Sequence, residues 1–149
     1  MIFKKRNAVF LILSLAVMTV IFWFSSRDAT ESTEQSDFFI LLFLKSLFES
    51  EIPIWLSVIV RKMAHFTAYA ALGFCLYYVF EGLVGHLKSF ICPLLVSVIY
   101  AVSDEIHQLF VPGRAGRLFD LFIDTIGASF GIAFAALVLL IIRKRRSCR

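Results

Sequence analysis

The stretch LFDLFIDTIGASFGIAFAALVLLII, Leu118 to Ile142, is an apolar run long enough to cross a bilayer as one helix. A hydrocarbon core of about 30 Å takes roughly 20 apolar residues at a rise of about 1.5 Å each. Two aspartates, Asp120 and Asp124, interrupt its beginning, and the basic run RKRR follows its end. The stretch therefore predicts a membrane-spanning helix that carries acidic side chains near one membrane surface.

The composition of the whole chain agrees with a membrane protein. Of its 149 residues, 60% are hydrophobic and 17% are charged, which is too apolar for an ordinary soluble domain of this length. Together with the first stretch, the runs long enough to span a bilayer are residues 8–24, 63–80, 93–110 and 118–142. We therefore predict an all-α fold, a single integral membrane bundle of four transmembrane helices over residues 1–149.

Two shorter apolar runs lie between the first and second predicted spans. FFILLFLKSLF begins at Phe38 and contains Lys45, and IPIWLSVIV begins at Ile52 and contains Pro53. Both are too short to span the bilayer. We predict that they lie in the membrane interface as amphipathic segments of the first outer loop, with Trp55 at headgroup level.

The distribution of cations predicts the orientation of the bundle. An even number of spans places both termini on one side, and basic residues cluster there before the first span and after the last. Because cytoplasmic loops are enriched in Lys and Arg, we predict a multi-pass membrane protein with both termini cytoplasmic. The net charge of +4 thus reflects membrane topology, and we predict no nucleic-acid partner.

Polar side chains recur at helical spacing near the outer ends of three spans. Residues three or four apart share a helix face, and these sets are Lys62, His65, Tyr69 and Gly73; Asp104 and Gln108; and Asp120, Asp124, Gly127 and Gly131. An ionisable residue at membrane depth costs about 2.5 to 3.5 kcal/mol and normally faces the bundle interior or a wet cavity. We therefore expect the three faces to point at one another.

The segment VPGRAGR joins the third and fourth spans. Pro112 fixes one backbone angle and Gly113 permits a positive φ, so the segment predicts a tight turn between antiparallel helices. That turn is expected to bring Arg114 close to the acids on both sides. Gly127 and Gly131 form a small-x3-small face, which we interpret as a helix-packing surface.

These motifs resemble those of the VanZ-like family of bacterial membrane proteins. The resemblance extends over most of the chain and is carried by three blocks: Lys62-x-x-His65-Phe66-x-x-Tyr69-x-x-Leu72-Gly73, then Ser103-Asp104-Glu105-x-x-Gln108-x-x-x-Pro112-Gly113-Arg114, then Asp120-x-x-x-Asp124-x-x-Gly127-x-x-x-Gly131. It implies a VanZ-like transmembrane domain and lowered susceptibility to teicoplanin-type lipoglycopeptide antibiotics. It implies no defined biochemical activity.

The first functional hypothesis is an outer-facing polar pocket that binds an anionic group. The planar guanidinium of Arg matches phosphate and carboxylate oxygens. The ligand would belong to a membrane lipid, a lipid-linked cell-wall precursor or the lipoglycopeptide itself. The predicted ligand-binding residues are Lys62, His65, Tyr69, Asp104, Glu105, Gln108, Arg114, Arg117, Asp120 and Asp124.

Two alternatives remain open at this stage. A membrane enzyme acting on a lipid-linked or acylated substrate would use His65, Asp104 or Glu105 as catalytic groups, and a metal-dependent version would add Asp120 as a ligand. The chain has no G-x-S-x-G, H-E-x-x-H or paired-Cys motif, so we assign no cofactor and no metal. In a structural alternative, the acids pair with Arg114, Arg117 and Lys62 only to lock the bundle. The concentration of polar groups at one membrane level favours a site.

Overall fold

The structure is a computed structural model of the chain and describes residues 5–44 and 52–147. These residues contain no strand and form five helices: α1 (Lys5–Ser25), α2 (Ala29–Leu44), α3 (Ile54–Phe80), α4 (Lys88–Gln108) and α5 (Leu118–Ser147). By length and composition, α1, α3, α4 and α5 can each cross a membrane. The predicted all-α bundle with four spans is confirmed.

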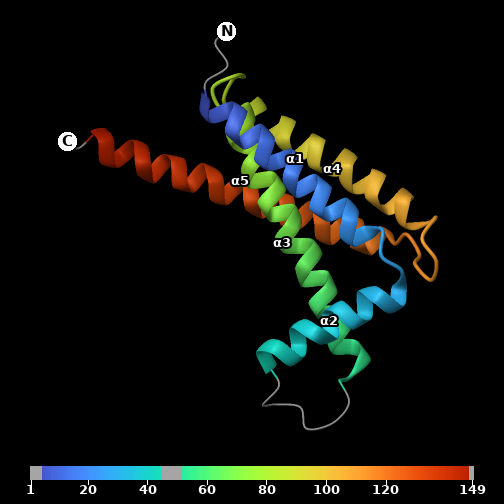
Figure 1. Cartoon of the computed structure of the whole chain (residues 1–149). Helices are drawn as coiled ribbons and strands as arrows, with labels where there is room; N and C mark the ends of the chain where they lie inside the picture. The colour runs from blue at the N-terminus through green and yellow to red at the C-terminus, as the bar shows by residue number, and fades with distance from the viewer. Residues whose placement is uncertain (1–4, 45–51, 148–149) are drawn as a thin grey trace.

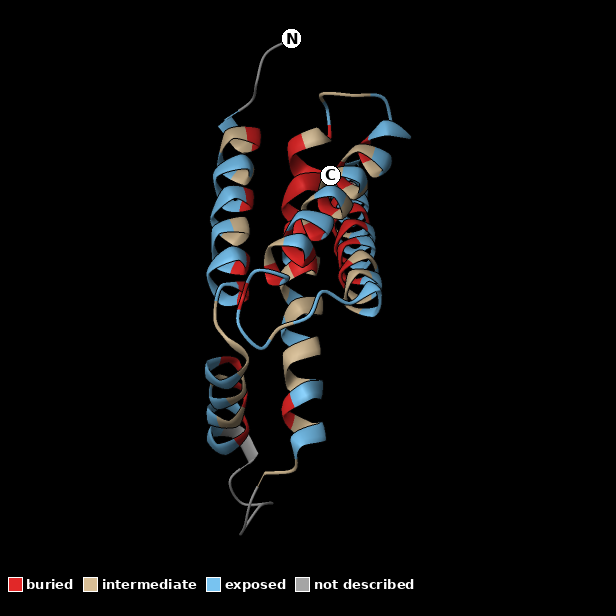
Figure 2. Ribbon diagram, turned by 90° about the vertical axis from the view of Figure 1, so that its right-hand side faces the viewer, coloured by how far each residue is buried: buried red, intermediate tan, exposed pale blue. Residues whose placement is uncertain are grey.

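The central helix of the bundle is α3, which packs against all four other helices. Its most extensive contact is with α5, while α2 lies across its N-terminal half (Figure 1). Buried residues follow the faces between helices, and the outward faces are exposed (Figure 2). Many outward side chains are large and apolar, such as Ile99, Phe110 and Leu118. Such an extended apolar surface suits contact with lipid.

Three glycines allow α3 and α5 to approach closely. A Cβ atom added at Gly131 would overlap the backbone carbonyl of Ala70, and additions at Gly73 and Gly127 would meet a carbonyl of the facing helix in the same way. Small residues at such crossings let helix backbones touch, which is a main source of helix association in lipid. The packing role predicted for Gly127 and Gly131 is confirmed.

At one end of the bundle, where α1 begins and α5 ends, a cluster of charged residues joins the helices. We call this end the terminal end. Glu81, just after α3, forms ion pairs with Arg6 of α1 and Arg143 of α5. Asn7 Nδ2 also donates a hydrogen bond of 2.8 Å to the carbonyl of Val79. Three helices are therefore fastened at this end. The opposite end, where α2 lies, is the pocket end (Figure 1).

The helix that contains the second predicted span begins earlier than that span, at Ile54. The segment from Ile52, expected in the interface as a separate piece, is the beginning of α3, which starts at Ile54. Pro53 does not interrupt the helix because it occupies the N-cap position, with φ −66° and ψ 133°. The first backbone N–H groups of a helix have no intrahelical acceptor, so a proline at this point removes no hydrogen bond.

Residues 38–44 of the segment from Phe38 belong to α2, which begins at Ala29. Lys45, expected to interrupt that segment, lies outside the described residues. The helix of the third predicted span begins earlier than that span, at Lys88, and the helix of the fourth continues beyond its span to Ser147.

Candidate functional site

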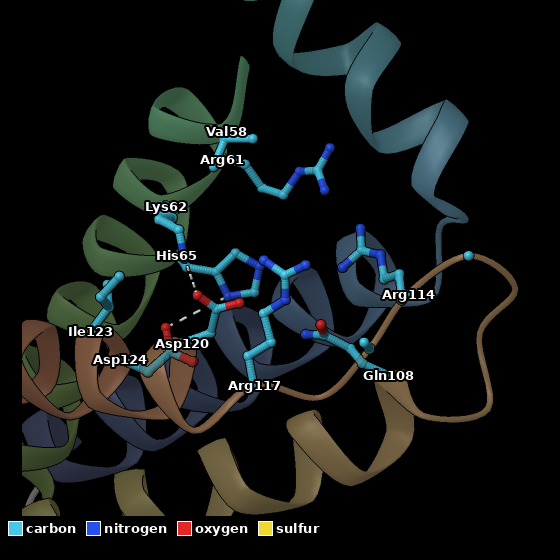
Figure 3. Close-up of a pocket in the computed structure, with 12 residues that line it drawn as sticks. Val58, Arg61, Lys62, His65, Gln108, Arg114, Arg117, Asp120, Ile123 and Asp124 are labelled. Carbon is cyan, nitrogen blue, oxygen red and sulfur yellow. Dashed lines mark hydrogen bonds and ion pairs between the residues drawn. The ribbon is translucent and has the colours of Figure 1, made fainter. Parts of the chain in front are cut away.

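A cavity of about 160 Å³ opens at the pocket end between α3, α5 and the loop that joins α4 to α5 (Figure 3). We call it the polar cavity. The N-terminal half of α3 and the beginning of α5 form its walls, and the loop covers a third side. Seven of the predicted ligand-binding residues line it: Lys62, His65, Gln108, Arg114, Arg117, Asp120 and Asp124.

The mouth of the polar cavity is rich in cations. Arg61, Arg114 and Arg117 direct their guanidinium groups toward it from α3 and from the loop (Figure 3). Lys62 pairs with Asp120, which joins α3 to α5. Among the described residues, the three arginines form no ion pair with a carboxylate. The cavity therefore has more positive charge than its own acids neutralise.

The arginines are positioned by neutral oxygen atoms. Arg61 donates to Thr33 Oγ1 of α2 at 2.8 Å, and Arg114 donates to the carbonyl of Phe24 at the end of α1 at 3.2 Å. Burial lowers the pKa of the Arg114 guanidinium, and the nearby charge of Arg61 lowers it further. An anion between these two guanidinium groups would offset both effects.

The floor of the polar cavity is acidic and buried. Asp124, with 0% of its surface exposed, lies with its Oδ1 3.5 Å from His65 Nδ1. Asp104 is buried outside the cavity lining, where its Oδ2 accepts hydrogen bonds from Ser25 Oγ at 2.9 Å and from Gln108 Nε2 at 3.1 Å. The site thus has two layers, with guanidinium groups at the mouth and carboxylates at the floor.

The loop between α4 and α5 is held by its own backbone and by Glu105. Gly113 has a φ of +71°, which confirms the turn predicted at Pro112–Gly113. Glu105 Oε2 accepts a hydrogen bond of 2.7 Å from the backbone N–H of Arg117. Glu105 therefore fixes the loop that carries Arg114 and Arg117.

Several predicted contacts are absent from the part of the chain that the structure describes. Arg114 and Arg117 form no ion pair with Asp104, Glu105 or Asp124 there. The structural alternative predicted that Arg114, Arg117 and Lys62 pair with the acids to lock the bundle. Of these three cations, only Lys62 does so among the described residues, with Asp120. Tyr69, Asp104 and Glu105 are buried beside or beneath the cavity and are not part of its lining.

Two residues of the site were not singled out from the sequence. Arg61 precedes His65 by four positions and so shares its helix face, a signal that was present in the spacing. Ser25, fully buried at the end of α1, hydrogen-bonds to Asp104 across helices. No spacing rule within a single helix predicts such a contact.

A second cavity of about 280 Å³ adjoins the first between α1, α2 and α3. Most of its lining is apolar and includes Val20, Ile21, Phe24 and Phe39. We call it the apolar cavity. Arg61, His65 and Arg114 line both cavities, so the cationic mouth lies at the boundary between them.

Comparison with known families gives one match, in which the VanZ/LLP1 model covers residues 10–141. The chain belongs to the VanZ/LLP1 family. The matched region contains the four apolar helices almost entirely and every residue of both cavities. The searches of curated proteins and of solved structures found no match. The site is therefore part of the VanZ/LLP1 domain itself.

Proposed function

We propose that this VanZ/LLP1 membrane protein binds the anionic headgroup of a lipid or lipid-linked molecule in the polar cavity. The molecule would be a membrane lipid, a cell-wall precursor or an acylated lipoglycopeptide. By occupying or shielding this group, the protein would lower susceptibility to teicoplanin-type antibiotics. The observation that carries the proposal is that three arginines face the cavity and, among the described residues, form no ion pair with a carboxylate.

The electrostatics of the mouth favour an anion over a neutral ligand. Four Lys or Arg side chains line the cavity against two aspartates, and one of these cations, Lys62, is already neutralised by Asp120. Guanidinium groups bind phosphate and carboxylate by paired, charge-assisted hydrogen bonds. Such bonds are strengthened where water is scarce, as between partly buried helices.

The apolar cavity explains why the ligand should be a lipid. It meets the polar cavity at Arg61 and Arg114, so a headgroup at the mouth would have an apolar space beside it for an acyl chain. Burial of each methylene group contributes about 0.8 kcal/mol. A soluble phosphate could use the arginines but would leave this space unfilled.

The distribution of basic residues favours an orientation in which the site faces the outside of the bacterial cell membrane. Arg6 and Arg143 lie at the terminal end, followed by Lys144, Arg145 and Arg146 in the last turn of α5. By the positive-inside rule this end is cytoplasmic, and the polar cavity lies at the other. Lipid-linked cell-wall precursors and lipoglycopeptides are accessible at the outer face.

The Arg114→Ala variant tests the proposal. In a susceptible host, the wild-type protein should raise the inhibitory concentration of teicoplanin, and Arg114→Ala should return it toward that of the empty vector at an equal membrane level. Native mass spectrometry of the same purified proteins should show weaker retention of phosphatidylglycerol, by roughly 10-fold or more, because a hydrogen bond to a charged group contributes about 1.5 to 3 kcal/mol.

Arg146→Ala is the matched control, because it removes an exposed arginine at the terminal end. It should retain both protection and lipid binding. Equal lipid retention by Arg114→Ala and wild type would contradict the proposal. A chemically altered lipid in cells that express the wild type would replace binding by an enzymatic role at the same site.

The orientation has its own test in a background without native cysteines. Ala115→Cys, in the exposed loop beside the cavity, should react with a membrane-impermeant thiol reagent added to intact cells. His86→Cys, in the exposed loop at the terminal end, should react only after the membrane is permeabilised. The reverse pattern would place the site in the cytoplasm.

A further inference from the structure

The two buried aspartates at the floor lack the counter-charge that their position demands. Asp104 and Asp124 are 3% and 0% exposed, and within the described ranges neither has an ion pair with Lys or Arg. Of the cations that line the cavity, Lys62 pairs with Asp120, and Arg114 donates its hydrogen bond to the Phe24 carbonyl without pairing with either aspartate. Removing an ionised carboxylate from water without a partner is costly. His65, even when protonated, can neutralise only one of the two.

The same residues present several buried atoms without a hydrogen-bond partner. These are both carboxylate oxygens of Asp124, Oδ1 of Asp104, and Nδ1 of His65; Asp124 Oδ1 and His65 Nδ1 meet only as an ion pair at 3.5 Å. Buried polar atoms are normally satisfied, so a group of four orphans at one point calls for a bound species. A water molecule could bridge two of them but would bring no charge.

The geometry of these atoms fits a metal ion. One ligand atom each from His65 on α3, Asp104 on α4 and Asp124 on α5 lies within 4.8 Å of the other two. Metal–ligand bonds of about 2.0 to 2.2 Å place ligand atoms on one ion roughly 3 to 4.4 Å apart. Small side-chain rotations would therefore bring all three into contact with a single ion.

Neighbouring side chains already orient the ligands. Ser25 and Gln108 donate to Oδ2 of Asp104, which leaves Oδ1 free to face the cluster. Metal-binding carboxylates are commonly held by such outer hydrogen bonds. Tyr69, one helical turn from His65, has a buried hydroxyl without a partner and is available for the same purpose.

We propose that His65, Asp104 and Asp124 bind one divalent transition-metal ion at the floor of the polar cavity. A site with one imidazole nitrogen and two carboxylate oxygens suits Zn²⁺, and Mn²⁺ less tightly, whereas Mg²⁺ and Ca²⁺ prefer oxygen ligands alone. The ion neutralises both aspartates. Because His65 and Asp124 line the cavity, a further coordination position faces it, as in zinc sites with three protein ligands.

This ligand set differs from the one that sequence reasoning connected with a metal-dependent enzyme. Glu105 holds the loop through the Arg117 N–H, and Asp120 pairs with Lys62, so both are already used. Asp124 takes their place. The site does not depend on the proposed binding of a lipid headgroup at the mouth.

The test is metal binding by the full-length protein in detergent, after treatment with a chelator. Titration with ZnCl₂ should give about one ion per chain, and ZnCl₂ should raise the melting temperature, since a ligand that binds only the folded state stabilises it. MnCl₂ should bind more weakly, and MgCl₂ should have no effect at the same concentrations.

Variants assign the ion to the site. Asp124→Asn and Asp104→Asn should each weaken Zn²⁺ binding by at least about 10-fold, and Ser25→Ala, which removes only an orienting hydrogen bond, by about 10-fold. His86→Gln and Glu34→Gln change exposed residues outside the cluster and should bind like wild type.

Gel filtration and melting in the absence of metal establish that each variant is folded. Stoichiometric binding that is lost in the folded aspartate variants supports the site. Absence of Zn²⁺ and Mn²⁺ binding by the wild type, or equal binding by wild type and Asp124→Asn, overturns the proposal.

Discussion

Substitution of Gly131 by leucine is expected to disrupt the bundle more than any other single change considered. A Cβ atom at this position already overlaps the Ala70 carbonyl, and a whole leucine side chain would force α3 and α5 apart. Rotation cannot relieve the clash because the obstacle is backbone. Overpacking of a well-filled core costs about 1 to 3 kcal/mol and occasionally more, and we expect at least the upper figure here. Thermal unfolding of the detergent-solubilised protein measures the effect.

Graded and matched variants make the result specific to the helix crossing. Gly131→Ala should destabilise less than Gly131→Leu but in the same direction, although alanine is the better helix former by about 1 kcal/mol. Gly85→Leu is the control, because a Cβ at this loop glycine meets no atom within 4 Å. Its stability should change by less than about 0.5 kcal/mol. An unchanged melting temperature for Gly131→Leu would show that the two helices do not cross here.

The spans could be predicted because a bilayer imposes a length and an apolar composition on any helix that crosses it. The start of the helix in the second span could not, because proline interrupts a helix from within but is tolerated at its first turn. Pro53 is of the tolerated kind, since it occupies the N-cap of α3. A rule that treats every proline as an interruption therefore placed the segment from Ile52 outside the helix.

The composition of the site was more predictable than its contacts. Helical spacing placed Lys62 and His65 on one face, and both line the cavity. Spacing gives no information about the partner of a long side chain on a different element. Arg114 lies near Asp104 and Glu105, as expected, but its guanidinium donates to the Phe24 carbonyl at the end of α1 and forms no ion pair with them among the described residues. The contact of Ser25 with Asp104 was missed for the same reason, since it joins residues far apart in sequence.

Asp124→Asn is expected to stabilise the metal-free protein. In wild type the Asp124 side chain is fully buried, and its one ion pair among the described residues is the 3.5 Å contact of Oδ1 with His65 Nδ1. The amide has the same shape but no charge, so the substitution removes a desolvation cost of about 2.5 to 3.5 kcal/mol on membrane-insertion scales. We expect the free energy of unfolding in excess chelator to rise by about 2 kcal/mol, since the His65 interaction is lost at the same time.

The sign of this change separates a structural role of the aspartate from a functional one. If Asp124 existed to lock the bundle through His65, its removal would leave a partner unsatisfied and lower the melting temperature. If Asp124 is instead kept to bind a ligand, its buried charge destabilises the fold. The Asp124→Asn variant should then gain stability and lose ligand binding. Asp120→Asn is the comparison, because Asp120 has a direct ion pair with Lys62. Loss of this pair should leave the free energy of unfolding unchanged or slightly reduced. A gain of stability in Asp124→Asn without a gain in Asp120→Asn, one helical turn away, would identify Asp124 as a residue kept for binding.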